Sequence, residues 1–297
     1  MSLSNVPVQI INLSVGQLRK LADQQGLTAV PGTTKVGLIR LLDESVEPAA
    51  LEAAAADYLY AGSTSVAWVQ FTDGPIAHAD LKRALTTMCG ADPFGNPLSP
   101  ALDSTPRLLS ARAWLHGKVI LTFGVRGSER VVIQGGQLTE VSDDSLFQGV
   151  FRLSDGVLEI RSSNVHVQKL RDFVQVLAQE LGRNAAQLPI TAADFDAVRT
   201  ALGASLTDYT GSDTSPSPFR TRSVTKKPTC ADLAVEPAFQ QEYGGLDVVK
   251  GDIVFLDGAA EEVTALVSIG SSSVYFRTTA TETTIDTVYE VLRGTWP

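Results

Sequence analysis

The stretch that most constrains the fold of this chain is residues 13–42, where two short helical patterns flank an extended segment. Ser14 and Gln17 have the spacing of a capping box, which marks the start of a helix. Apolar residues at helical spacing follow, namely Val15, Leu18 and Leu21. Gly26 then supplies a typical C-terminal stop. The pattern predicts a helix of about three turns that buries one face.

A second helix is predicted after an extended segment from Leu27 to Pro31. Thr33, which follows Gly32, is the candidate cap of this helix. One helical face then carries Lys35, Leu38, Ile39 and Leu42. A unit of roughly 30 residues buries little apolar surface alone, so it should pack against a neighbour. Pro48 opens an Ala-rich stretch that offers a third helix.

At these residues the chain resembles the SAP family of DNA-binding modules and, less closely, the helix-extension-helix units at the front of transcription terminators. The resemblance rests on Leu13, Val15, Leu18, Leu21, Gly26, Leu27, Gly32, Lys35, Leu38, Ile39 and Leu42. It implies that the turn and the start of the second helix face the DNA backbone. The residues it assigns to nucleic-acid contact are Gly32, Thr33, Thr34 and Lys35, flanked by Arg19, Lys20 and Arg40.

The extended segment departs from the family pattern at two points. It has one residue more before Gly32 and one more between Gly32 and Lys35, so Thr33 and Thr34 have no direct counterparts in the family pattern. The alternative is a helical hairpin that docks against protein and holds its lysines in water.

Two clusters of positive charge stand out in a chain whose net charge is −9. Residues 13–42 carry four cations and one acid, and residues 214–231 carry four cations and no acid. The cations of the second cluster are Arg220, Arg222, Lys226 and Lys227. Clustered cations suit phosphate contacts, so both clusters are candidate nucleic-acid contacts. Residues 232–297 carry eleven acids and three cations and should repel a phosphate backbone.

Beyond residue 61 the apolar pattern alternates, which indicates strands with amphipathic helices between them. Strands are predicted in SVAWVQF, KVILTFGV, LFQGVFRL and VLEIRSS. The segment KVILTFGV is expected to form a hairpin with ERVVIQ around a turn near Gly127. Helices are predicted in DGPIAHADLKRALTTM and NVHVQKLRDFVQVLAQELG. Together these features predict an α+β fold, in which an antiparallel sheet carries helices on one face.

The end of the chain repeats an earlier strand-helix pattern. The apolar spacing of Leu170, Phe173, Val174 and Leu177 recurs in Ile285, Val288, Tyr289 and Leu292. Arg161 and Arg277 stand at corresponding ends of the two strands, which suggests an internal duplication. Chance similarity explains the match equally well. If the duplication holds, the element order is similar to the saddle of TATA-box-binding proteins, by analogy only, because no motif of that family is present.

Four ranges summarise the predicted organisation. Residues 1–60 form the SAP-like helical module, and residues 61–205 form a first α+β unit. Residues 206–231 are a basic flexible linker or loop. Residues 232–297 form a second α+β unit, either separate or part of one domain with the first.

No motif for catalysis stands out in the sequence. The three histidines, His78, His116 and His166, share no spacing of metal ligands, and Cys89 and Cys230 lie far apart. The sequence also lacks the glycine-rich phosphate loops and the GxSxG motif. We therefore expect no enzyme activity, no metal and no cofactor.

The nearest approach to a catalytic pattern is DGVLEIR. Its Asp155, Glu159 and Arg161 loosely match the acids and the lysine with which many nucleases hold a divalent metal. The spacing is short, an arginine replaces the lysine, and Asp155 followed by Gly156 is typical of a hairpin turn. A metal-dependent nuclease is therefore the least favoured hypothesis.

Two hypotheses of different classes remain. The first is a non-catalytic protein that binds duplex DNA with weak sequence preference through the SAP-like module and the basic linker. The second is an interaction subunit whose acidic C-terminal part docks a basic partner, either another protein or a second copy of the chain. No apolar run approaches the roughly 20 residues that span a bilayer, and no leader is evident. We expect a cytoplasmic protein without a membrane partner.

Overall fold

The structure is a computed structural model, and the residues it describes fall into twelve segments. These are 13, 15–48, 50–51, 64–114, 117–127, 129–134, 137–142, 144–162, 164–213, 221–257, 262–278 and 280–296. Ser14, His116, Arg220 and most of the Ala-rich segment after Pro48 lie outside the described residues. None of the helices in the described segments has the length and apolar character needed to cross a membrane.

The N-terminal unit contains the two predicted helices, α2 (Val15–Gln24) and α3 (Lys35–Ser45). Its core consists of Leu13, Leu18, Leu21, Ala22, Leu38, Ile39, Leu42 and Leu51. Val15, predicted on the apolar face, is instead 41% exposed. The cap of α3 is Thr34 and not Thr33, because the extended backbone of Thr34 lets its hydroxyl accept a hydrogen bond from the N–H of Gly37.

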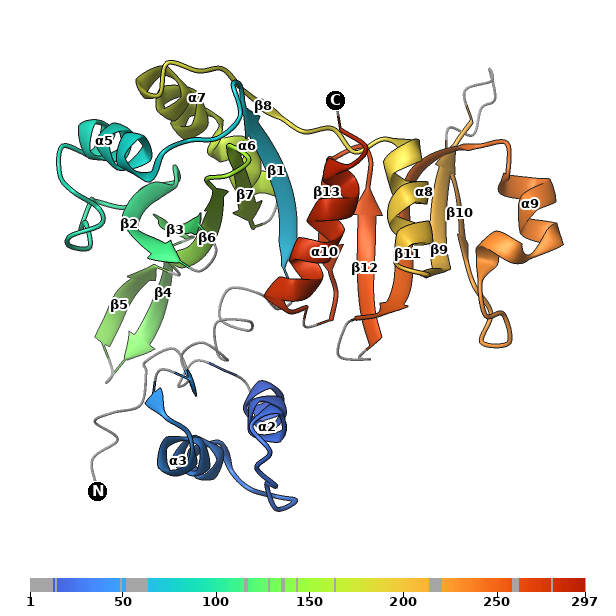
Figure 1. Cartoon of the computed structure of the whole chain (residues 1–297), viewed down its shortest axis with the longest axis horizontal. Coiled ribbons are helices and arrows are strands. Elements are labelled where there is room, and N and C mark those ends of the chain that lie inside the picture. Colours follow the sequence, from blue (N-terminus) through green and yellow to red (C-terminus); the bar gives the residue numbers. More distant parts are fainter. Residues whose placement is uncertain are drawn as a thin grey trace.

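An eleven-stranded sheet forms the body (Figure 1), and its neighbouring strands pair antiparallel. From one edge to the other the order is β10-β9-β11-β12-β13-β1-β7-β6-β3-β2, with β8 paired to β1. The strands of the first half are β1 (Ser65–Phe71), β2 (Arg107–Trp114), β3 (Lys118–Val125), β6 (Ser145–Arg152), β7 (Val157–Arg161) and β8 (Ala185–Gln187). The strands of the second half are β9 (Ser205–Ser212), β10 (Thr221–Thr225), β11 (Asp247–Leu256), β12 (Glu262–Ser268) and β13 (Ser273–Phe276). The predicted α+β fold with an antiparallel sheet is confirmed.

Helices cover opposite faces of the sheet in its two halves. One face packs against α5 (His78–Cys89), α6 (Asn164–Lys169) and α7 (Arg171–Glu180), and the other packs against α8 (Ala192–Ala201) and α10 (Glu282–Arg293). The central strand β1 contributes to both cores, because Val69 and Phe71 face the first helix group while Val66 and Trp68 face the second. The expectation that helices lie on one face of the whole sheet was therefore wrong.

The same order of elements occurs twice in the body. In the first half α5 precedes β2, β3, β6 and β7, which pair in sequence, and α6 and α7 follow. In the second half α8 precedes β9, β11, β12 and β13, and α10 follows. The strands β7 and β13 flank β1 and are both antiparallel to it. A half-turn rotation about the axis of β1 would exchange β7 with β13 and would also exchange the two faces of the sheet. This relation accounts for helices on opposite faces of the two halves rather than on one face.

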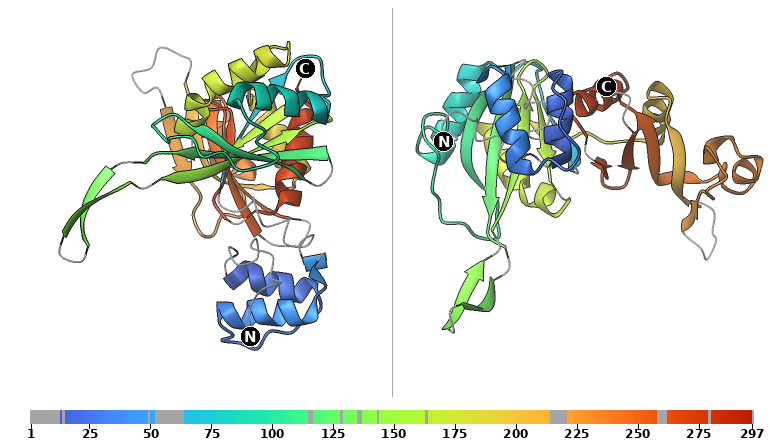
Figure 2. Two further views of the ribbon diagram at one scale, coloured as in Figure 1. Left: turned by 90° about the vertical axis from the view of Figure 1, so that its left-hand side faces the viewer. Right: turned by 90° about the horizontal axis from the view of Figure 1, so that it is seen from below.

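One prediction of local pairing was wrong. The strand β3 pairs with β2 and β6, and β4 (Glu129–Gln134) pairs instead with β5 (Gln137–Ser142) in a separate two-stranded sheet. This hairpin projects from the body (Figure 2). The strand β3 is buried along almost its whole length, as a central strand of the main sheet is. It therefore pairs with β6 in that sheet rather than with β4, the next strand along the chain.

In its described part, the range 206–231 forms strands rather than the predicted linker or loop. It contains most of β9 and all of β10, which form an antiparallel pair at the edge of the sheet. Val224 packs against the core, while Thr225 donates a hydrogen bond to Asp208 and Ser223 contacts Thr210. An edge strand with one partner keeps many residues in water, so its composition resembles that of a loop. The short helices η2 (Leu233–Val235) and α9 (Pro237–Tyr243) follow.

Candidate functional site

The turn between α2 and α3 positions the residues that the sequence assigned to nucleic-acid contact. Gly32 has a φ of 88°, in the left-handed region that favours glycine. The hydroxyl of Thr33 donates a hydrogen bond of 2.6 Å to the carbonyl of Val30. Lys35 is the first residue of α3, and helix geometry gives the N–H groups of Lys35 and Val36 no intrahelical acceptor. The turn therefore presents free donors beside an ammonium group.

Arg19 ties α2 to this turn. Its Nη2 donates to the carbonyl of Thr33 at 3.4 Å, which brings a guanidinium from the first helix to the start of the second. Gly37 allows the close packing of the turn, because a Cβ at this position would lie 2.8 Å from Cγ2 of Thr33. Sequence reasoning missed Gly37, although a glycine in the first turn of an amphipathic helix is a usable signal.

The remaining cations of the N-terminal unit are less closely grouped. Lys20 follows Arg19 on α2 and is half-buried, whereas Arg40 is exposed more than one turn beyond Lys35. Two apolar side chains flank the turn, Val30 at 70% exposure and Val36 at 55%. The structure thus brings Arg19, Thr33 and Lys35 together and leaves Arg40 at a distance along the helix.

The second basic cluster belongs to the far edge of the sheet. Arg222 is exposed on β10, and Lys227 is exposed just after it. Lys226 donates from Nζ to the carbonyl of Ala231 at 3.3 Å. These three cations lie on β10 and in the segment that follows it.

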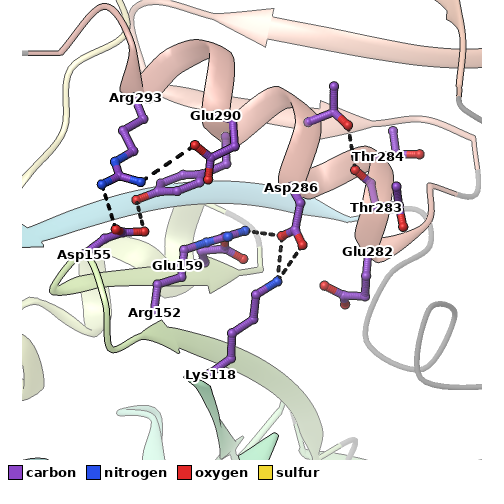
Figure 3. A network of polar contacts seen from close by, with 12 residues as sticks. Lys118, Arg152, Asp155, Glu159, Glu282, Thr283, Thr284, Asp286, Glu290 and Arg293 are labelled. Carbon is purple, nitrogen blue, oxygen red and sulfur yellow. Dashed lines mark hydrogen bonds and ion pairs between the residues drawn. The ribbon is translucent and has the colours of Figure 1, made fainter. Parts of the chain in front are cut away.

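A network of ion pairs joins the first half of the sheet to α10 (Figure 3). Glu159 on β7 is fully buried and lies between two guanidinium groups. Its carboxylate pairs with Nε of Arg152 and accepts from Nη2 of Arg161 at 2.7 Å. Arg161 also pairs with Glu282 on α10, where Nη2 donates to Oε2 at 2.7 Å. A single buried carboxylate therefore links two arginines that each reach across to the helix.

The network continues along α10 toward its C-terminal end. Asp286 pairs with Arg152 and accepts two bonds from Nζ of Lys118 at 2.6 and 2.8 Å. Further along, Asp155 accepts from the hydroxyl of Tyr289 at 3.1 Å and pairs with Arg293 at 2.9 Å. The Arg152 guanidinium also lies 4.0 Å from the centre of the Tyr289 ring. Each acid of the network therefore has at least one cationic partner.

The pKa directions in the network follow from burial and charge together. Burial favours a raised pKa for Glu159, but Arg161 and Arg152 outweigh it and lower this pKa. The pKa of Asp286 is likewise lowered, because Arg152 and Lys118 outweigh its burial. Burial raises the pKa of Glu282 despite the opposing charge of Arg161. Burial and the neighbouring Asp155 raise the pKa of Tyr289.

The carboxylates of the nuclease-like pattern are bound to protein groups. Asp155 holds Tyr289 and Arg293, and Glu159 holds Arg152 and Arg161. Among the described residues, no group of three or more His, Cys, Asp or Glu side chains is placed to hold a metal ion. The arrangement is that of a structural ion-pair network.

The two described histidines lie in separate surroundings. His78 contacts the ring of Phe94 at 5.1 Å, and His166 stacks on Phe147 at 4.9 Å. Nδ1 of His166 lies 2.5 Å from the hydroxyl of Ser162. Burial and then the charge of Lys169 lower the pKa of His166. The structure does not bring these histidines into one site.

No protein-family model and no curated protein matches the chain. The proposals below therefore rest on the geometry and charge of the chain itself.

Proposed function

We propose that this chain is a non-catalytic DNA-binding protein that holds the phosphate backbone of duplex DNA at the turn between α2 and α3. The observation that supports the proposal is the position of Lys35. Its ammonium belongs to the first residue of α3, beside free backbone N–H groups and the Arg19 guanidinium that reaches Thr33.

Electrostatics favour an anion at this end of α3. The helix dipole places partial positive charge at the N-terminus, and the first turn of α3 contains no acid. The acids of α3, Asp43 and Glu44, lie near its C-terminal end. A phosphate oxygen at the turn would thus meet donors and positive charge without a nearby carboxylate of the same helix.

Weak sequence preference follows from the kind of contact. Backbone N–H groups and ammonium groups bind phosphates and fix orientation, but they carry no base information. Lys20 and Arg40 add positive charge elsewhere on the two helices. Arg222, Lys226 and Lys227 are assigned no primary role, because they are fixed on the edge hairpin of the sheet.

A salt titration of duplex binding tests the proposal with matched variants. Lys35→Glu and Lys169→Glu change the net charge equally, and Lys169 is an exposed residue of α6 in the body. Lys35→Glu should weaken binding roughly tenfold and reduce the salt slope by about one unit, and adding Lys20→Glu should reduce the slope by about one unit more. Lys169→Glu should leave the slope unchanged. Equal effects of the two variants, or no effect of either, would remove the turn from DNA binding.

A further inference from the structure

The strand β10 ends the sheet and has only β9 as a neighbour. Four of its five residues are exposed, and only Val224 is half-buried. The opposite edge is protected, since β2 receives a backbone bond at Leu109 from Leu98 and donates one at Ala111 to Pro93. The described chain therefore covers one edge of its sheet and leaves the other open.

We infer that the open edge of β10 accepts an extended acidic peptide as an additional strand. This interaction is independent of the proposed DNA contact, because β10 belongs to the sheet of the body and not to the N-terminal unit. Two observations carry the inference, namely the free backbone groups of the edge and the positive charge around it.

The register shows which backbone groups are free. The N–H of Lys226 donates to the carbonyl of Thr207 at 2.9 Å, and antiparallel pairs alternate between bonded and unbonded positions. Val224 and Arg222 therefore bond toward β9, whereas the N–H and C=O groups of Ser223 and Thr225 point away from the sheet. A peptide strand is complementary to this row, since its own donors and acceptors alternate in the same way.

Charge selects the kind of peptide. Residues 221–231 contain Arg222, Lys226 and Lys227 and no acid, and the nearby Asp208 accepts a bond from Thr225. A second copy pairing through its own β10 would bring the same cations together, which is unfavourable across strands. Arg222, Val224 and Lys226 are alternate residues, so they lie on the same face of the strand. The complementary peptide therefore has an acid, an apolar residue and an acid at every second position.

The probe is a labelled peptide with the core Glu-Thr-Val-Thr-Glu, and its counterpart carries lysines in place of the glutamates. The wild-type chain should bind the acidic peptide at least about tenfold more tightly than the lysine peptide. Arg222→Glu should abolish this preference, because each peptide then meets one like charge and one opposite charge along the strand. Lys35→Glu should leave it unchanged, so failure of the DNA proposal remains distinguishable.

A backbone test separates strand addition from simple charge attraction. Ser223→Pro removes one outward N–H without removing a bond to β9, as proline on an edge strand allows. Ser223→Ala keeps that N–H and controls for the loss of the hydroxyl bonded to Thr210. Ser223→Pro should lower peptide affinity about tenfold, and Ser223→Ala should not.

Peptide chemistry gives a second readout if Ser223→Pro does not fold. A peptide N-methylated at an amide that faces β10 should lose binding to the wild-type chain, while methylation at the next amide should not. The inference is overturned if the wild-type chain binds neither peptide, or if N-methylation has no effect. Loss of duplex DNA binding in Arg222→Glu without any peptide preference would assign the edge to nucleic acid instead.

Discussion

Replacing Glu159 with glutamine removes one negative charge from the centre of the ion-pair network while keeping the shape of the side chain. Glu159 has no exposed surface, and its partners Arg152 and Arg161 are 6% and 3% exposed. After the substitution Arg161 retains Glu282 and Arg152 retains Asp286. Both guanidinium groups stay out of water with one carboxylate fewer.

The size of the effect follows from this burial. Removing one partner of a buried ion pair costs about 3–5 kcal/mol, because the remaining charge cannot regain its hydration. Each arginine keeps one carboxylate, so we expect the lower end of this range, about 3 kcal/mol. For a body of this size that loss corresponds to a fall in Tm of roughly 6–12 °C.

The matched control is Asp252→Asn at an arginine-carboxylate pair on the same sheet. Arg277, which corresponds to Arg161 in the repeated element order, binds Asp252 at 2.7 and 2.9 Å, but its side chain is 47% exposed. Water can replace the lost contact, so this change should cost about 0–1 kcal/mol. Urea denaturation and Tm measure the stability of both variants, and the dependence of the unfolding free energy on urea concentration should stay unchanged.

The reasoning is wrong if Glu159→Gln costs no more than Asp252→Asn. A second comparison tests the cause of the loss. Replacing Glu159, Arg161 and Glu282 together with methionine or leucine removes three buried charges and leaves only Arg152 with its pairing reduced. This triple variant should be more stable than Glu159→Gln, because uncompensated charge is worse than a packed apolar core.

Two further predictions concern a close backbone contact and acid stability. Gly156→Ala should lower the free energy of unfolding by roughly 3 kcal/mol or more, because the new Cβ would lie 2.2 Å from the carbonyl oxygen of Gly74. The control is Gly182→Ala, which has a similar φ and open space around the new Cβ. Measured by urea denaturation, this control should lose only about 1 kcal/mol. The lowered pKa of Asp286 stabilises the fold above the ordinary carboxylate range, and this stability is lost as pH falls through the folded pKa. The Tm of Asp286→Asn should therefore fall less than the Tm of the wild type between about pH 6 and pH 3. An equal fall in both proteins would contradict this linkage. The raised pKa of Glu282 acts in the opposite direction, and it does so in both proteins.

Local periodicity was sufficient to find most helices and strands. The apolar spacing of residues 170–177 and 285–292 predicted α7 and α10, and alternation predicted β1, β3, β6 and β7. The cap of α3 was placed one residue early, because Thr33 and Thr34 are chemically equivalent caps and only the backbone angles distinguish them. The pairing partners of the strands were harder to predict, since β3 pairs with β6 rather than with the next strand along the chain.

The positions of the helices on the sheet could not be predicted from alternation alone. In β1 four consecutive residues, Val66 to Val69, are buried, so the strand shows no polar face. A strand of this kind indicates cover on both sides, as in sheets packed between helices. The one-sided arrangement was expected from the order of strands and helices, and the burial of β1 on both faces contradicts it.

The ion pairs of α10 explain why the charge of a sequence segment misrepresents the surface of this protein. Residues 232–297 carry a large excess of acids, yet Glu282 and Asp286 pair with Arg161 and Arg152, which lie more than 100 residues earlier in the chain. Asp252 is paired as well, within its own half, with Arg277. The tail therefore offers less negative charge to a basic partner than its composition indicates. Arg222 on β10 and Lys227 just after it are exposed in the same half, so an acidic ligand there meets less repulsion than the segment charge suggests.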